Sequence, residues 1–287
     1  RFEAESHIKE WTEKLIPEGS KKDKLEVIDK LKSQTYIDNT EFDKDANLIV
    51  VENGILNLET GQLVPHTPTH YSNVLFPVNY VEPTFDDIEE NLEDTLFWKF
   101  LKSSFTVDGK FRKKDFDTVL EMMASVFIKR QIDAKAFMML GNGENGKSVC
   151  LGFLEAMVGR NNVTHIPLQD LAHDTFAPAD LHGKSANIFT DLEKDDLRHS
   201  GKLKAIVDNE GVRAHIKHGQ PFTLYPFAKL IFSCNRFPKT YDKSQGFYRK
   251  WIIIKWQRNF EKDPESIPKL REKLIENKTE TDEVFSN

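Results

Sequence analysis

The octapeptide GNGENGKS at residues 141–148 constrains this chain more than any other segment. The apolar stretch AFMML precedes it at 136–140, and apolar residues at helical spacing follow it as far as Val158. A strand, a glycine-rich loop and a helix in this order match the GxxxxGKS/T pattern, whose backbone N–H groups surround phosphates at a helix N-terminus. The segment therefore predicts a nucleotide-binding α/β domain. The expected binding residues are Gly141, Asn142, Gly143, Glu144, Asn145, Gly146, Lys147 and Ser148.

Two residues of this loop and two nearby acids carry separate chemical roles. We expect Lys147 to neutralise the β and γ phosphates of ATP and the Ser148 hydroxyl to ligate Mg2+. A P-loop enzyme also needs carboxylates at the end of a neighbouring strand, and NIFTDLE at 187–193 supplies Asp191 and Glu193. We assign Asp191 to the metal, usually through water, and Glu193 to the attacking water. A non-catalytic acidic turn is the alternative, because further aspartates follow at once.

A polar residue ends another apolar stretch. KLIFSC at 229–234 is typical of a buried strand, and Asn235 follows it directly. Ligands of open α/β sheets bind at the carboxyl ends of the strands. Asn235 is therefore a candidate to hydrogen-bond the γ-phosphate or the attacking water, and a turn-initiating asparagine is the alternative.

Strand-like and helix-like segments alternate through the second half of the chain. ANIFT at 186–190 and KWIIIKW at 250–256 join the two strands already named. Such alternation predicts a mainly parallel sheet flanked by helices, the architecture of an α/β P-loop domain.

The first half is organised differently. Helical spacing predicts two helices in 1–34 and further helices in 85–107 and 114–130, while short apolar stretches in 47–64 indicate a small β-meander. We therefore expect a smaller helical and β-meander domain, which serves as a collar or adaptor, then the P-loop domain, then a C-terminal helix with a polar tail. The expected limits of these parts are 1–120, 121–265 and 266–287.

Charge and composition narrow the classes of function. The net charge is −6, but residues 198–258 hold thirteen Lys and Arg against three carboxylates, which suits nucleic acid. No apolar run is long enough to cross a bilayer, and the two cysteines form no CxxC pair. We expect an intracellular protein without membrane attachment, disulfide framework or structural zinc. The chain begins at Arg1, which indicates a segment of a longer polypeptide.

The order of four motifs is more specific than any one of them. GNGENGKS, NIFTDLE, VRAHIKHGQPFTLYPFAKLIFSCN and SQGFYRKWIIIKW follow one another between residues 134 and 260. This order resembles the superfamily 3 helicases, in particular the primase-helicases of phages, plasmids and poxviruses. The segment NLIVVENGILNLETGQLVPHTP is similar to the domain that precedes the motor in those proteins. The resemblance thus extends over most of the chain.

The resemblance implies an AAA+ type motor that uses ATP and Mg2+, assembles as a ring, commonly a hexamer, and moves along single-stranded DNA in the 3' to 5' direction. It implies single-stranded DNA and forked duplex as partners, a primase fused upstream, and the host cytoplasm for a phage or plasmid protein. Arg249 matches the position from which such helicases reach into the neighbouring ATP site, with Lys250 as the alternative. Lys217 and His218 occupy the tip of an expected hairpin at 212–224 that contacts DNA in the channel.

Other functions stay open on the residues alone. A P-loop kinase or nucleotide switch would use the same loop without DNA, and a replication-initiation module would bind DNA beside a vestigial nucleotide site. Arg249 and Lys250 also fit a solvated strand edge, and the hairpin fits an ordinary surface feature. The second motif departs from family members with two adjacent acids, because Thr190 precedes Asp191 here.

Overall fold

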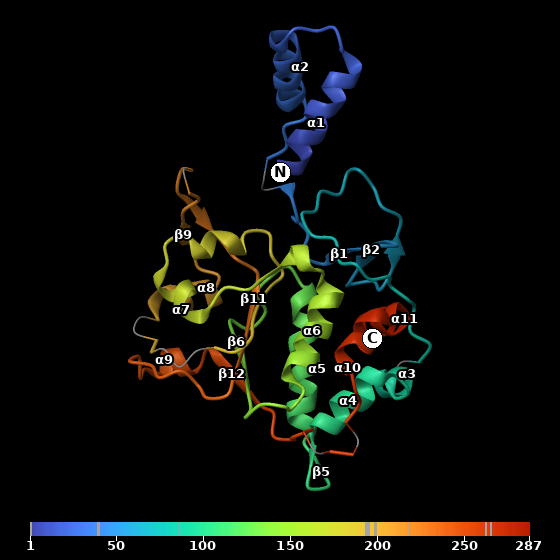
Figure 1. The fold of residues 1–287 in the computed structure, drawn as a ribbon, viewed down its shortest axis with the longest axis vertical. Helices are drawn as coiled ribbons and strands as arrows, with labels where there is room; N and C mark the ends of the chain where they lie inside the picture. Colours follow the sequence, from blue (N-terminus) through green and yellow to red (C-terminus); the bar gives the residue numbers. More distant parts are fainter. Residues whose placement is uncertain are drawn as a thin grey trace. The chain divides into compact units, whose positions relative to one another are not determined.

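The protein is described from a computed structural model. The residues that it describes are 2–38, 41–85, 87–192, 196–197, 200–217, 219–261, 263–264 and 266–287. The chain forms two compact units, Arg1–Lys44 and Asp45–Asn287 (Figure 1).

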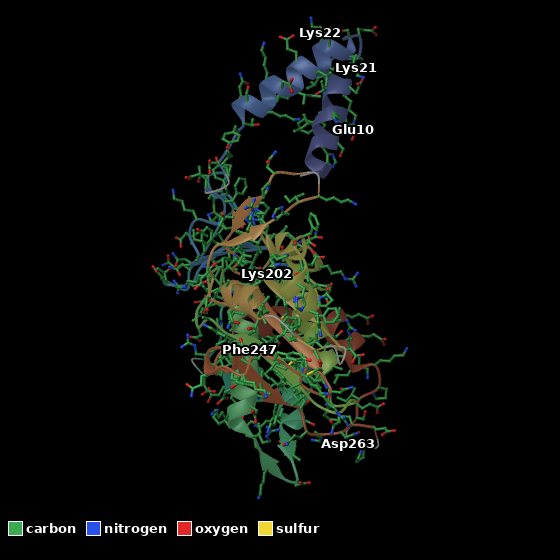
Figure 2. The ribbon with its side chains drawn as sticks, turned by 90° about the vertical axis from the view of Figure 1, so that its left-hand side faces the viewer. Glu10, Lys21, Lys22, Lys202, Phe247 and Asp263 are labelled. Carbon is green, nitrogen blue, oxygen red and sulfur yellow. The ribbon has the colours of Figure 1, made fainter. Side chains whose placement is uncertain are left out.

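The first unit is a pair of helices, α1 (Phe2–Leu15) and α2 (Lys21–Gln34). Ser20 caps α2, because its hydroxyl accepts a hydrogen bond from Asp23 N at 3.3 Å while its own N–H donates to the Asp23 carboxylate at 2.9 Å. This reciprocal pair satisfies two backbone donors that a helix start leaves open. Both predicted helices are confirmed. Their exposed charged side chains include Glu10, Lys21 and Lys22 (Figure 2).

A five-stranded sheet organises the second unit, and all its neighbouring strands pair in parallel. The strand order is β12-β6-β11-β8-β7, so the fourth of these strands along the chain, β11, lies between the first, β6, and the third, β8. The predicted parallel sheet is confirmed. The strands are β6 (Ala136–Leu140), β7 (Val163–Thr164), β8 (Ala186–Phe189), β11 (Lys229–Cys234) and β12 (Trp251–Lys255).

Helices cover both faces of this sheet. Along β6, Phe137 and Met139 join one hydrophobic cluster while Ala136 and Met138 join the other, as the two-residue period of a strand requires. The first cluster contains α5 (Lys113–Phe127) and α6 (Lys147–Val158), and the second contains α7 (Leu168–His173) and α8 (Gly201–Val207), which lie on opposite sides of the strands in Figure 1. Short connecting helices are η2 (Arg160–Asn162), η3 (Ala177–Leu181) and α9 (Gln245–Tyr248).

Residues 45–112 pack against the P-loop domain instead of forming a separate body. The Phe97 ring stacks on Phe153 of α6 with centroids 4.6 Å apart, and Phe76 meets Phe127 of α5 edge-on at 4.9 Å. The compact units therefore divide the chain at residue 44 and not near residue 120. The elements of this segment are an antiparallel meander of β1 (Leu48–Val51), β2 (Gly54–Asn57) and β3 (Leu63–Val64), helices α3 (Ile88–Leu92) and α4 (Leu96–Ser104), and the hairpin of β4 (Thr106–Val107) and β5 (Lys110–Phe111).

The C-terminal segment is helical to its end. It forms α10 (Leu270–Glu276) and α11 (Lys278–Ser286), so the expected polar tail is instead a packed helix. The Asp282 carboxylate accepts hydrogen bonds from Asn79 N at 2.8 Å and from Asn79 Nδ2 at 3.0 Å. These polar contacts explain why a polar sequence is buried here. Within the described residues, no helix is both long and apolar enough to span a bilayer.

Candidate active site

The loop between β6 and α6 has the backbone that its glycines predict. Gly143 and Gly146 have φ angles of 97° and 87°, in the left-handed region that glycine adopts without strain. A Cβ at Gly141 would lie 2.1 Å from Asn145 Nδ2 and 2.4 Å from Trp256 O, so no larger residue fits there. Asn145 Nδ2 in turn donates to Trp256 O at 3.2 Å. The loop is therefore held against the segment that follows β12.

Lys147 is folded back into this loop. Its side chain is buried, and Nζ donates to Gly141 O at 2.6 Å and to Asn145 Oδ1 at 3.0 Å. Burial lowers the pKa of Lys147, while neighbouring Cys234 and Asp191 act in the opposite direction. The ammonium thus sits at the carboxyl edge of the sheet, close to the ends of β11 and β8.

The strand order brings Asn235 and Asp191 to the same edge of the sheet as Lys147. Cys234 of β11 pairs with Leu140 of β6, and Gly141 N donates to Cys234 O at 3.2 Å, which places Asn235 beside the loop. On the other side of β11, Leu192 N donates to Ser233 O at 3.0 Å, which brings exposed Asp191 to the same edge. Asp191 has a φ of 64°, an uncommon value for aspartate. Glu193 lies outside the described residues.

The oxygen ligands at this edge suit magnesium. Ser148 is exposed in the first turn of α6, on the side of the loop that faces solvent, and Asp191 offers a carboxylate. Among the described residues, no group of three or more His, Cys, Asp or Glu side chains could hold a metal by itself. Mg2+ commonly binds through one or two protein oxygens, substrate phosphates and water, so a sparse protein set fits this ion.

The hairpin predicted after α8 is present. β9 (Val212–Ala214) pairs antiparallel with β10 (Phe222–Leu224), and Ala214 lies opposite Phe222. Lys217 is exposed in the connection between the two strands. His218 lies outside the described residues.

The structure distinguishes Arg249 from Lys250. The Lys250 ammonium forms an ion pair with Asp208, and only 12% of its side chain is exposed. Arg249 follows α9 and is exposed, and no carboxylate pairs with its guanidinium in the described part of the chain. Of the two cations, Arg249 is the one available to a second molecule.

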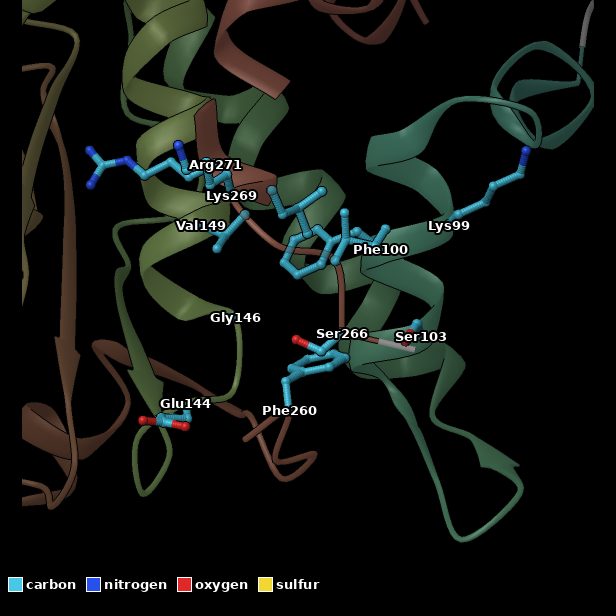
Figure 3. A pocket seen from close by; sticks show the side chains of 12 residues that line it. Lys99, Phe100, Ser103, Glu144, Gly146, Val149, Phe260, Ser266, Lys269 and Arg271 are labelled. Atoms are coloured by element: carbon cyan, nitrogen blue, oxygen red, sulfur yellow. The ribbon is translucent and has the colours of Figure 1, made fainter. Parts of the chain in front are cut away.

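A cavity that no sequence motif indicates lies beside the loop. It encloses about 530 Å³ and is lined by α4, by the start of α6, by Phe260 and by the start of α10 (Figure 3). The sequence motifs also do not indicate the contact between Asn145 and Trp256, which lie 111 positions apart. No local pattern connects residues this far apart, so only a pairing of distant segments could have revealed them.

Two family models match the chain. The model described as D5 N terminal like matches residues 1–106, and a family of unknown function, DUF5906, matches residues 139–250. A helicase-named protein of Invertebrate iridescent virus 3 (121R) is 26% identical over 248 residues, covering 82% of this chain and 25% of that protein. A helicase-named protein of Acanthamoeba polyphaga mimivirus is 22% identical over 236 residues, covering 80% of this chain and 24% of that protein. The chain therefore spans about a quarter of the length of these relatives.

Solved structures share the fold. Two apo structures of the C-terminal region of NrS-1 superpose with TM-scores of 0.56 and 0.57 at 15% and 14% identity, each covering 76% of this chain and 50% of that one. The fold agrees with what the order of motifs predicted, and the viral relatives and the D5-like region agree with the resemblance. The chain is therefore similar to helicase-named viral proteins over about four fifths of its length, and its first 106 residues match the D5 N terminal like model.

Proposed function

We propose that this chain is the ATP-dependent motor of a replication primase-helicase, a superfamily 3 helicase that acts as a ring on single-stranded DNA inside the host cell. The observation that carries the proposal is the meeting of Lys147, Asp191 and Asn235 at one edge of the sheet. Phosphoryl transfer needs a phosphate cradle, a metal-binding carboxylate and a polar group near the γ-phosphate in this arrangement. A six-membered ring, 3' to 5' movement, forked duplex as substrate and a primase upstream belong to the same proposal.

Each residue of the site would have its own role in ATP hydrolysis. Lys147 leaves Gly141 O and Asn145 Oδ1 when phosphates arrive, since an ammonium gains more from phosphate oxygens than from neutral carbonyls. Ser148 and Asp191 hold Mg2+, which neutralises charge on the phosphates. Asn235 hydrogen-bonds the γ-phosphate or the attacking water, and Glu193 positions that water.

Two further contacts would join the site to other molecules. Arg249 reaches the ATP site of a neighbouring subunit, where its charge stabilises the transition state. Lys217 and His218 contact DNA from the hairpin, where Lys217 supplies charge for a phosphate.

The deciding experiment is steady-state ATP hydrolysis with and without single-stranded DNA, comparing the native chain with Lys147→Ala. We expect DNA to stimulate the native chain and Lys147→Ala to lose activity by roughly 100-fold or more, on the scale of removing one preorganised transition-state donor. Lys110→Ala is the matched control, because Lys110 is exposed on β5, outside the loop. ATP turnover that persists in Lys147→Ala would contradict the proposal.

A further inference from the structure

Arg249 belongs to a short segment that other elements hold in place. This segment, residues 244–250, contains α9 and leads directly into β12, and we call it the Arg249 turn. Ser244 caps α9, because its hydroxyl accepts a hydrogen bond from Phe247 N at 3.2 Å. Phe247 is buried in the same hydrophobic cluster as α8, on the same side of the strands (Figure 1). A helix of four residues is not stable by itself, so its contacts with neighbouring elements decide where Arg249 lies.

The first polar contact is made by the Asp242 carboxylate, just before the turn. One of its oxygens accepts hydrogen bonds from the Ser200 hydroxyl and from Lys204 Nζ, the latter at 2.9 Å, and both donors belong to the first turn of α8 or its cap. The other oxygen accepts from Ser244 N at 2.9 Å. These hydrogen bonds, the one from Ser200 foremost, keep the pKa of Asp242 well below its usual range. A charged Asp242 therefore joins the start of the Arg249 turn to α8.

The second polar contact is the ion pair between Lys250 and Asp208, at the other end of the turn. Asp208 directly follows α8, and its backbone N–H donates to Lys204 O at 2.8 Å. Only 12% of the Lys250 side chain and 26% of the Asp208 side chain are exposed, so salt screens this pair less than a surface pair. The Lys250 carbonyl oxygen accepts from Ala136 N at 2.7 Å, which fixes the backbone as well. Thus α8 holds the Arg249 turn at both ends.

The side chain of Arg249 is exposed between these two contacts, although its backbone is fixed. The Arg249 N–H donates to Gln245 O at 3.0 Å, and its carbonyl oxygen accepts from the Lys135 ammonium. A fixed backbone below a free guanidinium suits a residue that presents its charge to another molecule. Order that exists before binding lowers the entropy lost when the contact forms.

We propose that Lys250 and Asp208 are positioning residues for Arg249. Their ion pair, together with the Asp242 contact, holds the Arg249 turn so that the guanidinium reaches the ATP site of a second copy of the chain. The inference rests on the proposed function, which places Arg249 at that site. The two adjacent cations then have different tasks: Arg249 contacts the phosphates of the neighbouring site, and Lys250 fixes the direction from which Arg249 approaches them.

Steady-state ATP hydrolysis by Lys250→Met and Asp208→Asn tests the ion pair. Each variant should lower kcat about 100-fold, the scale of a misplacement of about 1 Å. Each should leave the KM for ATP within about twofold, because the phosphate loop of the same chain is unchanged and the lost interaction belongs to the transition state. Lys113→Met, which breaks an exposed ion pair with Asp117 on α5, is the matched control and should change neither. Turnover within about twofold of the native value in both ion-pair variants would overturn the inference.

A reversed ion pair guards the test against loss of folding. Removing one charge of a partly buried pair destabilises a protein, so thermal unfolding of each variant is measured first. The double variant Lys250→Asp with Asp208→Lys restores opposite charges at the two positions and should return kcat to within about tenfold of the native value. A folded double variant whose kcat stays further below the native value contradicts the inference.

Mixed oligomers separate a role at the neighbouring site from a defect in the same chain. A Lys250→Met subunit keeps its own phosphate loop, so mixing it with Lys147→Ala, which keeps Arg249, should restore part of the turnover. Mixing Lys250→Met with Arg249→Ala should restore none, because neither subunit then presents a correctly held Arg249. Asp208→Asn takes the place of Lys250→Met if only the former folds. The opposite pattern, or no recovery in either mixture when subunits are shown to exchange, rules the inference out.

Arg249→Ala separates this inference from the proposed function. If Arg249→Ala keeps the native turnover, the proposed role of Arg249 fails and the inference fails with it. If Arg249→Ala loses turnover while both ion-pair variants keep it, only the inference fails. Loss of turnover in all three variants, with recovery only in mixtures that contain Lys147→Ala, supports both.

Discussion

Lys229 is a charged residue inside the central strand of the sheet. Only 3% of it is exposed, and its Nζ donates to the carbonyls of Ile128, Arg130 and Phe227 at 2.8, 2.7 and 3.0 Å. Burial lowers the pKa of Lys229 to about 8. The residue joins β11 to the end of α5, so its protonation affects the stability of the sheet that carries the site.

This shift predicts a pH dependence of stability. The folded chain binds the Lys229 proton less tightly than the unfolded chain, whose lysine pKa is roughly 10.4. The free energy of unfolding should therefore rise between about pH 8 and 10.4, by up to about 3 kcal/mol, as the unfolded state holds the extra proton. Urea unfolding of the native chain and of Lys229→Met at pH 7.5 and 10 measures this increase. At each pH, the free energy of unfolding of the variant is subtracted from that of the native chain. A difference that is the same at both pH values would contradict the shift.

The β9–β10 hairpin shows what a short sequence pattern can specify. Alternation from Val212 to Leu224 around a polar centre predicts two strands and a turn, and the structure has them at 212–214 and 222–224. By contrast, 85–107 has one helical period along its length but forms two helices, α3 and α4. Thr95 begins α4, because its hydroxyl accepts from Trp98 N at 3.2 Å. The capping hydrogen bond starts a new helix at Thr95, although the helical spacing of apolar residues continues through that position.

The hairpin also carries a prediction about DNA. Lys217→Ala should weaken binding of single-stranded DNA and reduce the dependence of log affinity on log salt by about 0.7, the value for one phosphate contact on a single strand. Basal ATP hydrolysis should stay within about twofold, since Lys217 lies in the hairpin and not in the loop. Fluorescence anisotropy over a salt series measures both. Lys243→Ala, another exposed lysine of the basic segment, is the control, and an equal loss in both variants would count against a specific hairpin contact.

Arg249 is the residue that we propose to reach the ATP site of a second copy of the chain. It is exposed, whereas the neighbouring Lys250 is paired with Asp208. Arg249→Ala should therefore preserve assembly but lower ATP hydrolysis by about 1,000-fold, the scale of an arginine supplied in trans. Light scattering and a turnover assay measure these two quantities.

Mixing two inactive variants gives a sharper form of this prediction. In oligomers of Arg249→Ala with Lys147→Ala, some interfaces join an intact Lys147 to an intact Arg249, so part of the activity should return. No recovery in mixtures that are shown to exchange subunits would exclude Arg249 from the neighbouring site.

The phosphate loop could be read from consecutive residues because its requirements are local. Glycine supplies the φ angles at Gly143 and Gly146, and apolar periods mark the strand before and the helix after. The helices of the first unit and the meander at 47–64 follow from equally local rules.

Other features depend on contacts between distant segments, which no local pattern encodes. The insertion of β11 between β6 and β8 brings Asn235 and Asp191 to the loop. Lys250 forms an ion pair with Asp208. Residues of α4 and Phe260 line the same cavity. Each of these features joins residues from widely separated parts of the chain. They therefore form only when the buried faces of the sheet and the helices pack together.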